Sequence, residues 1–141
     1  MKKKIIILGS TGSIGKNTID VVKAMPESFE VSAISAHSNE KELLQQAKEL
    51  GVRSIALTGR KPEDSAIRYH SPEGLLDMIA ETEADIVVNG VAGSAGLMPS
   101  VVSLQSGKDL ALANKETIVM AGSFIAAVEK KSGKKIIPVD S

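Results

Sequence analysis

The chain has 141 residues, 43% of them apolar, which is enough for one domain with a substantial core. Its 17 basic and 17 acidic side chains cancel, and its aromatic residues are one tyrosine and two phenylalanines, so we expect no binding to nucleic acid or to an anionic membrane. The absence of cysteine excludes disulfides and a thiolate nucleophile and fits a cytoplasmic location, and no apolar run is long enough to span a membrane.

The first predicted unit is a strand, a glycine-rich turn and a helix within residues 3–22. Residues 5–8 form a continuous apolar run, which is typical of a parallel strand covered on both faces. After the turn, apolar residues recur at helical spacing, and Pro26 ends the helix. The residues expected on the apolar face of this helix are Ile14, Thr18, Val21, Val22 and Met25.

The turn carries glycines at a spacing of three, a Gly-x-x-Gly-x-x-Gly variant of the dinucleotide fingerprint. Gly9 would allow a tight exit from the strand, Gly12 the close approach of a diphosphate, and Gly15 close packing of the helix on the sheet. The N–H groups and dipole of the new helix would then face an anion. Ser13 is a candidate helix cap.

This turn has two other interpretations. A P-loop requires Gly-x-x-x-x-Gly-Lys-Ser/Thr, but this sequence has Ser10 at the first glycine position and Asn17 after the lysine. A plain tight connection between strand and helix needs no ligand at all. The order of strand, turn and helix favours nucleotide binding over that second interpretation.

The end of the second predicted strand, residues 30–35, bears on the choice of cofactor. In NAD-binding units an acidic residue at this position binds the adenosine ribose. Here the strand is followed by His37, Ser38 and Asn39, with Lys41 close behind and no acid before Glu40. Polar donors and a nearby cation favour NADP(H), and Ser38 or Asn39 also suits the N-cap of the next helix.

Alternating strands and helices continue along the whole chain. The remaining predicted elements are a helix at 40–50 closed by Gly51, strands at 53–57 and 67–70, a helix at 71–83, a strand at 84–91, a helix from Pro99 to Gly107, a strand at 109–113, a helix at 117–131 and a last strand at 135–139. This order predicts an α/β fold, a Rossmann-like doubly wound, mostly parallel sheet with helices on both faces.

Polar and glycine-rich segments follow three of the later strands. A second glycine-rich turn spans residues 90–96, and we expect it on the ligand edge of the sheet, although tight packing alone would explain it equally well. Asn114, Lys115 and Glu116 follow the strand at 109–113, and Asp140 and Ser141 follow the last strand. Because natural domains seldom end directly after a strand, we expect the sequence to be truncated.

Four segments in order resemble one family: ILGSTGSIG, the VAGSAGL turn, LANKE and the closing PVDS. Together with their spacing they resemble 1-deoxy-D-xylulose 5-phosphate reductoisomerase across essentially the whole chain. The resemblance implies that residues 1–141 are the NADPH-binding domain of that enzyme. The family converts 1-deoxy-D-xylulose 5-phosphate to 2-C-methyl-D-erythritol 4-phosphate in non-mevalonate isoprenoid biosynthesis, using NADPH and Mg²⁺, Mn²⁺ or Co²⁺. A cytoplasmic homodimer is expected for the full-length enzyme.

The resemblance also implies roles for individual residues. Lys115 and Asp140 are the expected catalytic residues: Lys115 would contact the substrate together with Ser141, and Asp140 would bind the metal. A hard carboxylate suits such an ion, and a lysine can hold substrate oxygens by charge-assisted hydrogen bonds. The expected NADPH contacts are Thr11, Gly12, Ser13, Ile14, Ser38, Asn39, Asn114 and Glu116.

Two departures from the family pattern shape the expectations. Many members have glycine where His37 stands, and since histidine adopts positive φ far less freely, the approach of the adenosine phosphate could differ here. The family also continues past Ser141 into a catalytic domain with a second metal carboxylate and a phosphate pocket. We therefore expect the 141-residue chain at most to bind NADPH, without turnover.

Other classes fit the sequence less well. A short-chain dehydrogenase needs Tyr-x-x-x-Lys, but Tyr69 has Glu73 four residues on, and aspartate-semialdehyde dehydrogenases need a cysteine. The alternative from a different class is a non-catalytic nucleotide-sensing Rossmann domain. That alternative predicts no role for Lys115 and Asp140 at the ligand edge.

Overall fold

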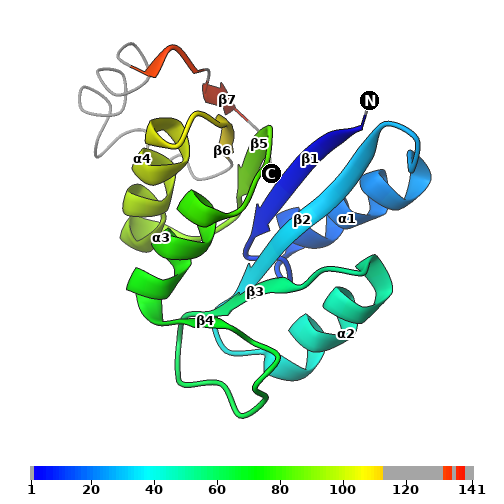
Figure 1. Ribbon diagram of the computed structural model, residues 1–141, viewed down its shortest axis with the longest axis vertical. Coiled ribbons are helices and arrows are strands. Elements are labelled where there is room, and N and C mark those ends of the chain that lie inside the picture. The colour runs from blue at the N-terminus through cyan, green and yellow to red at the C-terminus, as the bar shows by residue number, and fades with distance from the viewer. Residues whose placement is uncertain (1, 113–131, 135, 139–141) are drawn as a thin grey trace.

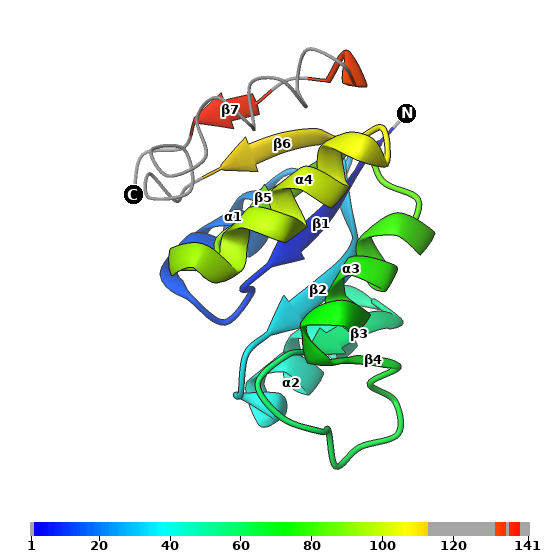
Figure 2. The ribbon, with the colours of Figure 1, turned by 90° about the vertical axis from the view of Figure 1, so that its left-hand side faces the viewer.

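A single parallel sheet forms the middle layer of the protein. The computed structural model describes residues 2–112, 132–134 and 136–138. In these residues seven strands pair in the order β4-β3-β2-β1-β5-β6-β7, and every pair is parallel (Figures 1 and 2). The strands are β1 (Lys3–Leu8), β2 (Phe29–Ala36), β3 (Ser54–Leu57), β4 (Tyr69–His70), β5 (Ile86–Asn89), β6 (Asp109–Leu112) and β7 (Ile136–Pro138).

Helices cover both faces of this sheet, as the sequence predicts. Figure 1 shows α1 (Ser13–Ala24) and α2 (Glu40–Leu50) on one face, and α3 (Ser71–Glu81) and α4 (Leu97–Gln105) on the other. The connection from β1 leads through α1 to β2 on one side of β1, whereas β5 pairs with the other side of β1. Strands are therefore added on one side of β1 up to β4 and on its other side from β5 onward. Doubly wound sheets bind ligands at the point where the strand order reverses in this way.

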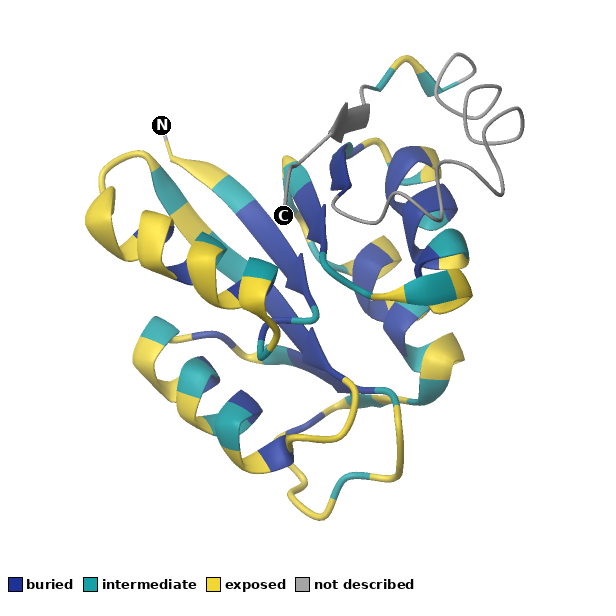
Figure 3. Ribbon diagram, turned by 180° about the vertical axis from the view of Figure 1, so that it is seen from behind, coloured by how far each residue is buried: buried dark blue, intermediate teal, exposed yellow. Residues whose placement is uncertain are grey.

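The central strand β1 is buried on both faces, which explains its uninterrupted apolar run. Ile5 and Ile7 pack in the core under α1 and α2, and Ile6 and Leu8 pack in the core under α3 and α4. None of the four is more than 5% exposed. Figure 3 shows the buried strands between helices whose outer faces are exposed. In the described part of the chain, no helix is long and apolar enough to cross a membrane.

The buried face of α1 differs from the predicted one. Gly15, Ile19 and Val22 face the sheet, whereas Val21 and Met25 are 51% and 46% exposed. Positions 15, 19 and 22 follow the i, i+4, i+7 spacing of one helical face, and Val21 lies about 100° away from Val22 around the axis. The prediction of an inward Val21 and Met25 was wrong. Val21 and Val22 are adjacent and both apolar, so the sequence alone does not show which of them faces the sheet.

Several predicted boundaries also shift. The strand expected at 67–70 is confined to Tyr69–His70, the helix expected to end at 83 ends at Glu81, and the strand expected at 84–91 spans Ile86–Asn89. The helix expected from Pro99 begins at Leu97, after a 3₁₀ turn η1 (Gly93–Gly96). The helix predicted at 117–131 lies outside the described residues.

Gly15 sets how closely α1 can approach the end of β1. A Cβ atom added there would lie 2.4 Å from the Gly9 carbonyl oxygen and 2.5 Å from the Ser10 Cα, both of them backbone atoms. We predict that Gly15→Ala lowers the free energy of unfolding by about 2–3 kcal/mol, because the helix must move away from the sheet. Urea denaturation followed by circular dichroism measures this change.

Gly12→Ala is the matched control for that experiment. A Cβ atom at Gly12 would meet only the Gly9 carbonyl oxygen, at an ordinary 3.5 Å, and φ there is −83°. Its unfolding free energy should fall by no more than about 1 kcal/mol, the cost of alanine in place of glycine at an N-cap. Equal denaturation midpoints for the two variants would contradict the packing role assigned to Gly15.

Candidate nucleotide-binding site

The first glycine-rich turn lies at the carboxyl edge of the sheet, between β1 and α1. Gly9 has φ of +74°, so it needs the freedom of glycine, and a Cβ atom there would lie 3.2 Å from the carbonyl of Gly90. Gly15 packs α1 on the turn, as described above. Two of the three predicted glycine roles, the tight exit and the close packing, are therefore confirmed by geometry within the chain itself.

Gly12 is different, because the fold makes no demand for glycine at this position. Its φ and ψ of −83° and 178° are accessible to any residue, and the space beside it is open. Gly12 and Ser13 are exposed, and Thr11 and Ile14 are partly buried. A missing side chain where the fold would tolerate one is the arrangement expected if a ligand approaches the backbone closely.

The backbone N–H groups of this turn are available to an anion. In the described part of the chain, no acceptor is bound by the N–H groups of Thr11, Ser13 and Ile14. The prediction that Ser13 caps α1 was wrong: Gly12 holds the N-cap position, and no side chain caps the helix. The positive end of the α1 dipole thus faces the edge of the sheet without a carboxylate or hydroxyl from α1 to neutralise it.

The end of β2 supplies the second part of the site. Ser38 and Asn39 are both exposed beyond the strand. Asn39 is the N-cap of α2, as predicted, and its Oδ1 accepts a hydrogen bond of 3.2 Å from the Glu42 N–H. Its Nδ2 donates to the Glu42 carboxylate at 2.9 Å. Asn39 is therefore held in place by α2 while remaining accessible.

The backbone of His37 does not adopt a positive φ. Among the described residues other than glycine, only Ser71 has a positive φ, so His37 needs no glycine-like backbone. The His37 ring lies over Gly59, where an added Cβ atom would be 2.9 Å from two ring atoms. Its Nδ1 is 3.4 Å from the Thr58 hydroxyl. The replacement of glycine by histidine thus leaves the backbone path unstrained at this point.

Arg60 is a cation at the end of β2 that the sequence analysis missed. Its Nη1 donates to the Glu40 carboxylate at 2.9 Å, and its Nη2 lies 3.5 Å from the Ser38 carbonyl oxygen. Arg60 comes from the connection after β3, and β3 pairs with β2, so the adjacency of the two strand ends is the signal that could have revealed it. The predicted cation Lys41 lines a neighbouring groove with Asn39.

Glu40 is a buried acid that binds the connection following β3. Its carboxylate accepts from the N–H of Glu63 at 3.0 Å and of Asp64 at 2.8 Å, and it pairs with Arg60. The Glu40 side chain is only 9% exposed. The Glu63 N–H, with smaller contributions from Asp64 and Arg60, lowers the pKa of Glu40 below its ordinary 4.5, against the opposing effect of burial.

Glu40 should make folding stability depend on acid pH. Since the folded-state pKa is lowered, the carboxylate stabilises the fold above the ordinary pKa of 4.5 and loses that contribution as pH falls through the folded-state value. We predict that Glu40→Gln lowers the urea midpoint at pH 7, and that its difference from the unmutated protein shrinks as pH falls from about 5 to 3. Glu63→Gln keeps the backbone donor to Glu40 and should retain the acid dependence. A Glu40→Gln difference that is constant with pH would contradict this role.

The second glycine-rich turn lies against the first. The Gly90 N–H donates to the Leu8 carbonyl at 2.9 Å, and a Cβ atom on Gly90 would be 3.5 Å from Ile14 Cβ. The turn therefore sits at the carboxyl edge of the sheet beside the first one. Gly90 packs tightly against the first turn, whereas Gly93 has φ of +70° and no described atom within 4 Å of an added Cβ atom. Tight packing therefore explains Gly90 but not Gly93, and a ligand role for this turn stays a prediction.

Asn89, at the end of β5, is a buried residue that sequence reasoning missed. Its Nδ2 donates to the Gly96 carbonyl at 3.0 Å and to the Ser100 hydroxyl at 2.9 Å, and its Oδ1 accepts from the Val91 N–H at 3.0 Å. The Asn89 side chain is 0% exposed. It therefore fixes the shape of residues 90–96 from inside.

We predict that Asn89→Ala lowers the free energy of unfolding by about 2–3 kcal/mol, because it removes acceptors and donors from buried groups. Chemical denaturation measures the loss. Ser94→Ala, an exposed change in the same turn, is the control and should be close to neutral. A neutral Asn89→Ala would show that the buried network does not hold the turn.

The remaining predicted site residues lie outside the described residues: Asn114, Lys115, Glu116, Asp140 and Ser141. The strands that precede them are described, and Leu112 at the end of β6 pairs with Pro138 of β7. Both strands run parallel to β1, so they end at the same edge of the sheet as the first turn. Within the described residues there is no group of three histidine or acidic side chains that could hold a metal ion.

The comparisons with known proteins agree with the motifs. The family described as 1-deoxy-D-xylulose 5-phosphate reductoisomerase matches residues 5–122. The protein of that name from Treponema denticola is 43% identical over 144 residues, covering 99% of this chain and 36% of the relative. The one from Thermodesulfovibrio yellowstonii is 40% identical, covering 99% of this chain and 38% of the relative. The chain thus spans little more than a third of these relatives.

Solved structures give the same result. A crystal structure of DOX-P reductoisomerase in complex with magnesium matches 100% of this chain and 38% of its own, with a TM-score of 0.89 and 31% identity. The Zymomonas mobilis enzyme in complex with NADPH matches 99% of this chain and 39% of its own, with a TM-score of 0.89 and 27% identity. A biliverdin reductase from Synechocystis, at 16% identity and a TM-score of 0.70, shares the fold alone. The fold is therefore Rossmann-like, and the chain belongs to the 1-deoxy-D-xylulose 5-phosphate reductoisomerase family.

Proposed function

We propose that residues 1–141 form the NADPH-binding domain of an enzyme that converts 1-deoxy-D-xylulose 5-phosphate to 2-C-methyl-D-erythritol 4-phosphate. The observation that carries the proposal is the open backbone at Gly12, where the fold would accept a side chain and the sequence provides none. This opening lies beside the N–H groups of Thr11 and Ser13, which bind no acceptor among the described residues. It also lies at the end of β1, where the strand order of the sheet reverses. The motifs and the family membership supply the reaction.

The first turn fits the diphosphate of a dinucleotide. Thr11, Ser13 and Ile14 present backbone N–H groups at the start of α1, and Thr11 and Ser13 add two hydroxyls, which is the donor set that an anion requires. The Gly12 N–H donates to the Gly9 carbonyl at 3.1 Å, so Gly12 contributes open space beside the backbone rather than a donor. The relative from Zymomonas mobilis was solved in complex with NADPH. We assign Thr11, Gly12, Ser13 and Ile14 of this chain to the cofactor diphosphate.

The end of β2 favours NADPH over NADH. The acid that would bind the ribose hydroxyls of NADH is missing from this strand end, and the first acid that follows, Glu40, has its carboxylate bound by Arg60 and two backbone N–H groups. Ser38 and Asn39 remain as polar contacts for the adenosine side of the cofactor, and Arg60, paired with Glu40, and Lys41 are cations close to this strand end. A 2′-phosphate would therefore meet donors rather than a carboxylate.

The other assignments rest on the resemblance and on the position of the strands that precede them. Asn114 and Glu116 are proposed as further NADPH contacts, Lys115 and Ser141 as substrate contacts, and Asp140 as a ligand of Mg²⁺, Mn²⁺ or Co²⁺. When bound, NADPH supplies a hydride and the divalent ion polarises the substrate carbonyl. Lys115 would orient the substrate oxygens through charge-assisted hydrogen bonds. A homodimer and a cytoplasmic location remain predictions.

We predict that the protein binds NADPH at least about tenfold more tightly than NADH, since a 2′-phosphate gains charge-assisted hydrogen bonds at the end of β2. Calorimetric titration with each dinucleotide measures the ratio.

Gly12→Ala should remain folded, with a loss of no more than about 1 kcal/mol, while weakening NADPH binding by about tenfold, because its methyl group occupies the open side of the turn. A folded protein that binds neither dinucleotide, or that prefers NADH, would contradict the proposed function.

A further inference from the structure

We propose that Gln46 of α2 is a positioning residue for the cofactor: it holds the Ser10 segment so that the following residues present their N–H groups to the diphosphate. This inference rests on the proposed function. It assigns a role to a helix side chain that lies outside the glycine-rich turn and outside the residues expected to touch NADPH.

Gln46 and Ser10 are joined by two hydrogen bonds of opposite direction. The Ser10 hydroxyl donates to Gln46 Oε1 at 2.7 Å, and Gln46 Nε2 donates to the Ser10 carbonyl oxygen at 2.9 Å. Ser10 is 0% exposed, so both of its groups depend on protein partners rather than on water. A single amide side chain therefore satisfies the hydroxyl and the carbonyl of one turn residue.

The strand beside the turn completes this arrangement. The Ser35 carbonyl accepts from the Ser10 N–H at 2.8 Å, and the Ser35 hydroxyl accepts from the Gly9 N–H at 3.2 Å. Every polar group of Ser10 thus has a partner from β2 or α2. The turn has a fixed first half, Gly9 and Ser10, and an open second half from Thr11 to Ile14.

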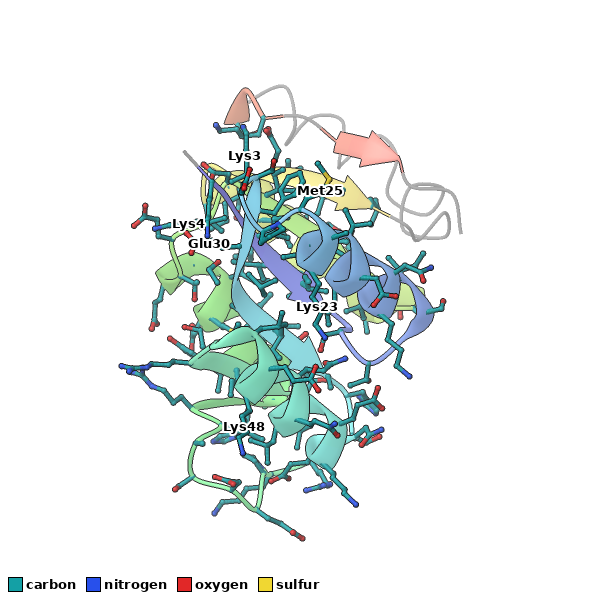
Figure 4. The ribbon with its side chains drawn as sticks, turned by 90° about the vertical axis from the view of Figure 1, so that its right-hand side faces the viewer. Lys3, Lys4, Lys23, Met25, Glu30 and Lys48 are labelled. Carbon is teal, nitrogen blue, oxygen red and sulfur yellow. The ribbon has the colours of Figure 1, made fainter. Side chains whose placement is uncertain are left out.

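One face of α2 links both ends of the proposed cofactor site. Asn39, Glu42 and Gln46 follow the i, i+3, i+7 spacing of a single helical face. Asn39 lies at the adenosine end, Glu42 pairs with Lys16 of α1 at 3.0 Å, and Gln46 holds the turn. A second ion pair, Lys23–Glu49 at 2.8 Å, joins the two helices farther from the turn. Figure 4 labels Lys23 on α1.

This geometry gives α2 a specific task. The helix sets the spacing between the adenosine contact at Asn39 and the diphosphate contacts of the turn, because the same rigid element positions both. Loss of the Gln46 amide would leave the buried hydroxyl and carbonyl of Ser10 without their α2 partners. The turn would then have to reorder on binding, at a cost in affinity.

Gln46→Met tests the proposal, because methionine has a similar length and helix propensity but forms neither hydrogen bond. We expect it to weaken NADPH binding by about tenfold, as positioning groups around a site commonly do. Gln45→Met is the matched control: Gln45 is the exposed neighbour on α2, its amide reaches only Glu49 at 3.5 Å, and its loss should leave NADPH affinity within about twofold.

Two further measurements separate positioning from simple stabilisation. Adenosine 2′-monophosphate lacks the diphosphate, so its affinity should change less than about twofold in Gln46→Met. Ser10→Ala removes only the hydroxyl and should weaken NADPH binding by a smaller factor, and the double variant should lose less than the product of the two single losses, because both changes act on one contact. Ser10→Ala also serves as the milder variant if Gln46→Met does not fold.

The outcomes distinguish this inference from the proposed function. If the unmutated protein binds NADPH and folded Gln46→Met or Ser10→Ala binds it equally well, the positioning role is wrong and the proposed function stands. Equal losses for NADPH and adenosine 2′-monophosphate would also overturn it, because they would indicate a general loss of structure. If the unmutated protein does not bind NADPH, both proposals fail.

Discussion

The whole site depends on how closely the start of α1 can lie against the end of β1. At Gly15 the backbone of the helix approaches the Gly9 carbonyl so closely that a Cβ atom would lie 2.4 Å from it. This contact directs the first turn of α1 toward the carboxyl edge of the sheet. The N–H groups of Thr11, Ser13 and Ile14 are consequently gathered where two diverging connections leave β1 and β5.

Around this contact the fold divides its polar residues into supporting and presenting groups. Ser35 and Gln46 bind Ser10, Glu40 binds the connection after β3, and Asn89 binds the second turn from inside. Of the residues assigned to the cofactor, the four in the first turn, Thr11 to Ile14, are exposed or partly buried. A rigid base beneath an open row of donors is what a binding site needs if little free energy is to be lost in ordering it.

The sequence predicted the strands, the turn and the family, because local pattern determines each of them. The apolar run of β1, the glycine spacing and the Asn39 cap are all readable from neighbouring residues. The partnerships of Gln46 with Ser10 and of Arg60 with Glu40 join residues far apart in the chain, so no local pattern reveals them. The inward face of α1 was misassigned because Val21 and Val22 are both apolar, and only packing on the sheet selects Val22.

The central claim is that the turn from Thr11 to Ile14 receives the diphosphate of NADPH, and it concerns individual backbone amides. The most direct measurement is therefore a titration with NADPH followed by ¹H–¹⁵N nuclear magnetic resonance. We expect the largest shifts on the amides of Thr11, Gly12, Ser13 and Ile14, with a second group at Ser38 and Asn39. Shifts confined to the charged groove between α1 and α2, around Lys23 and Glu49, with the turn unaffected, would contradict this claim.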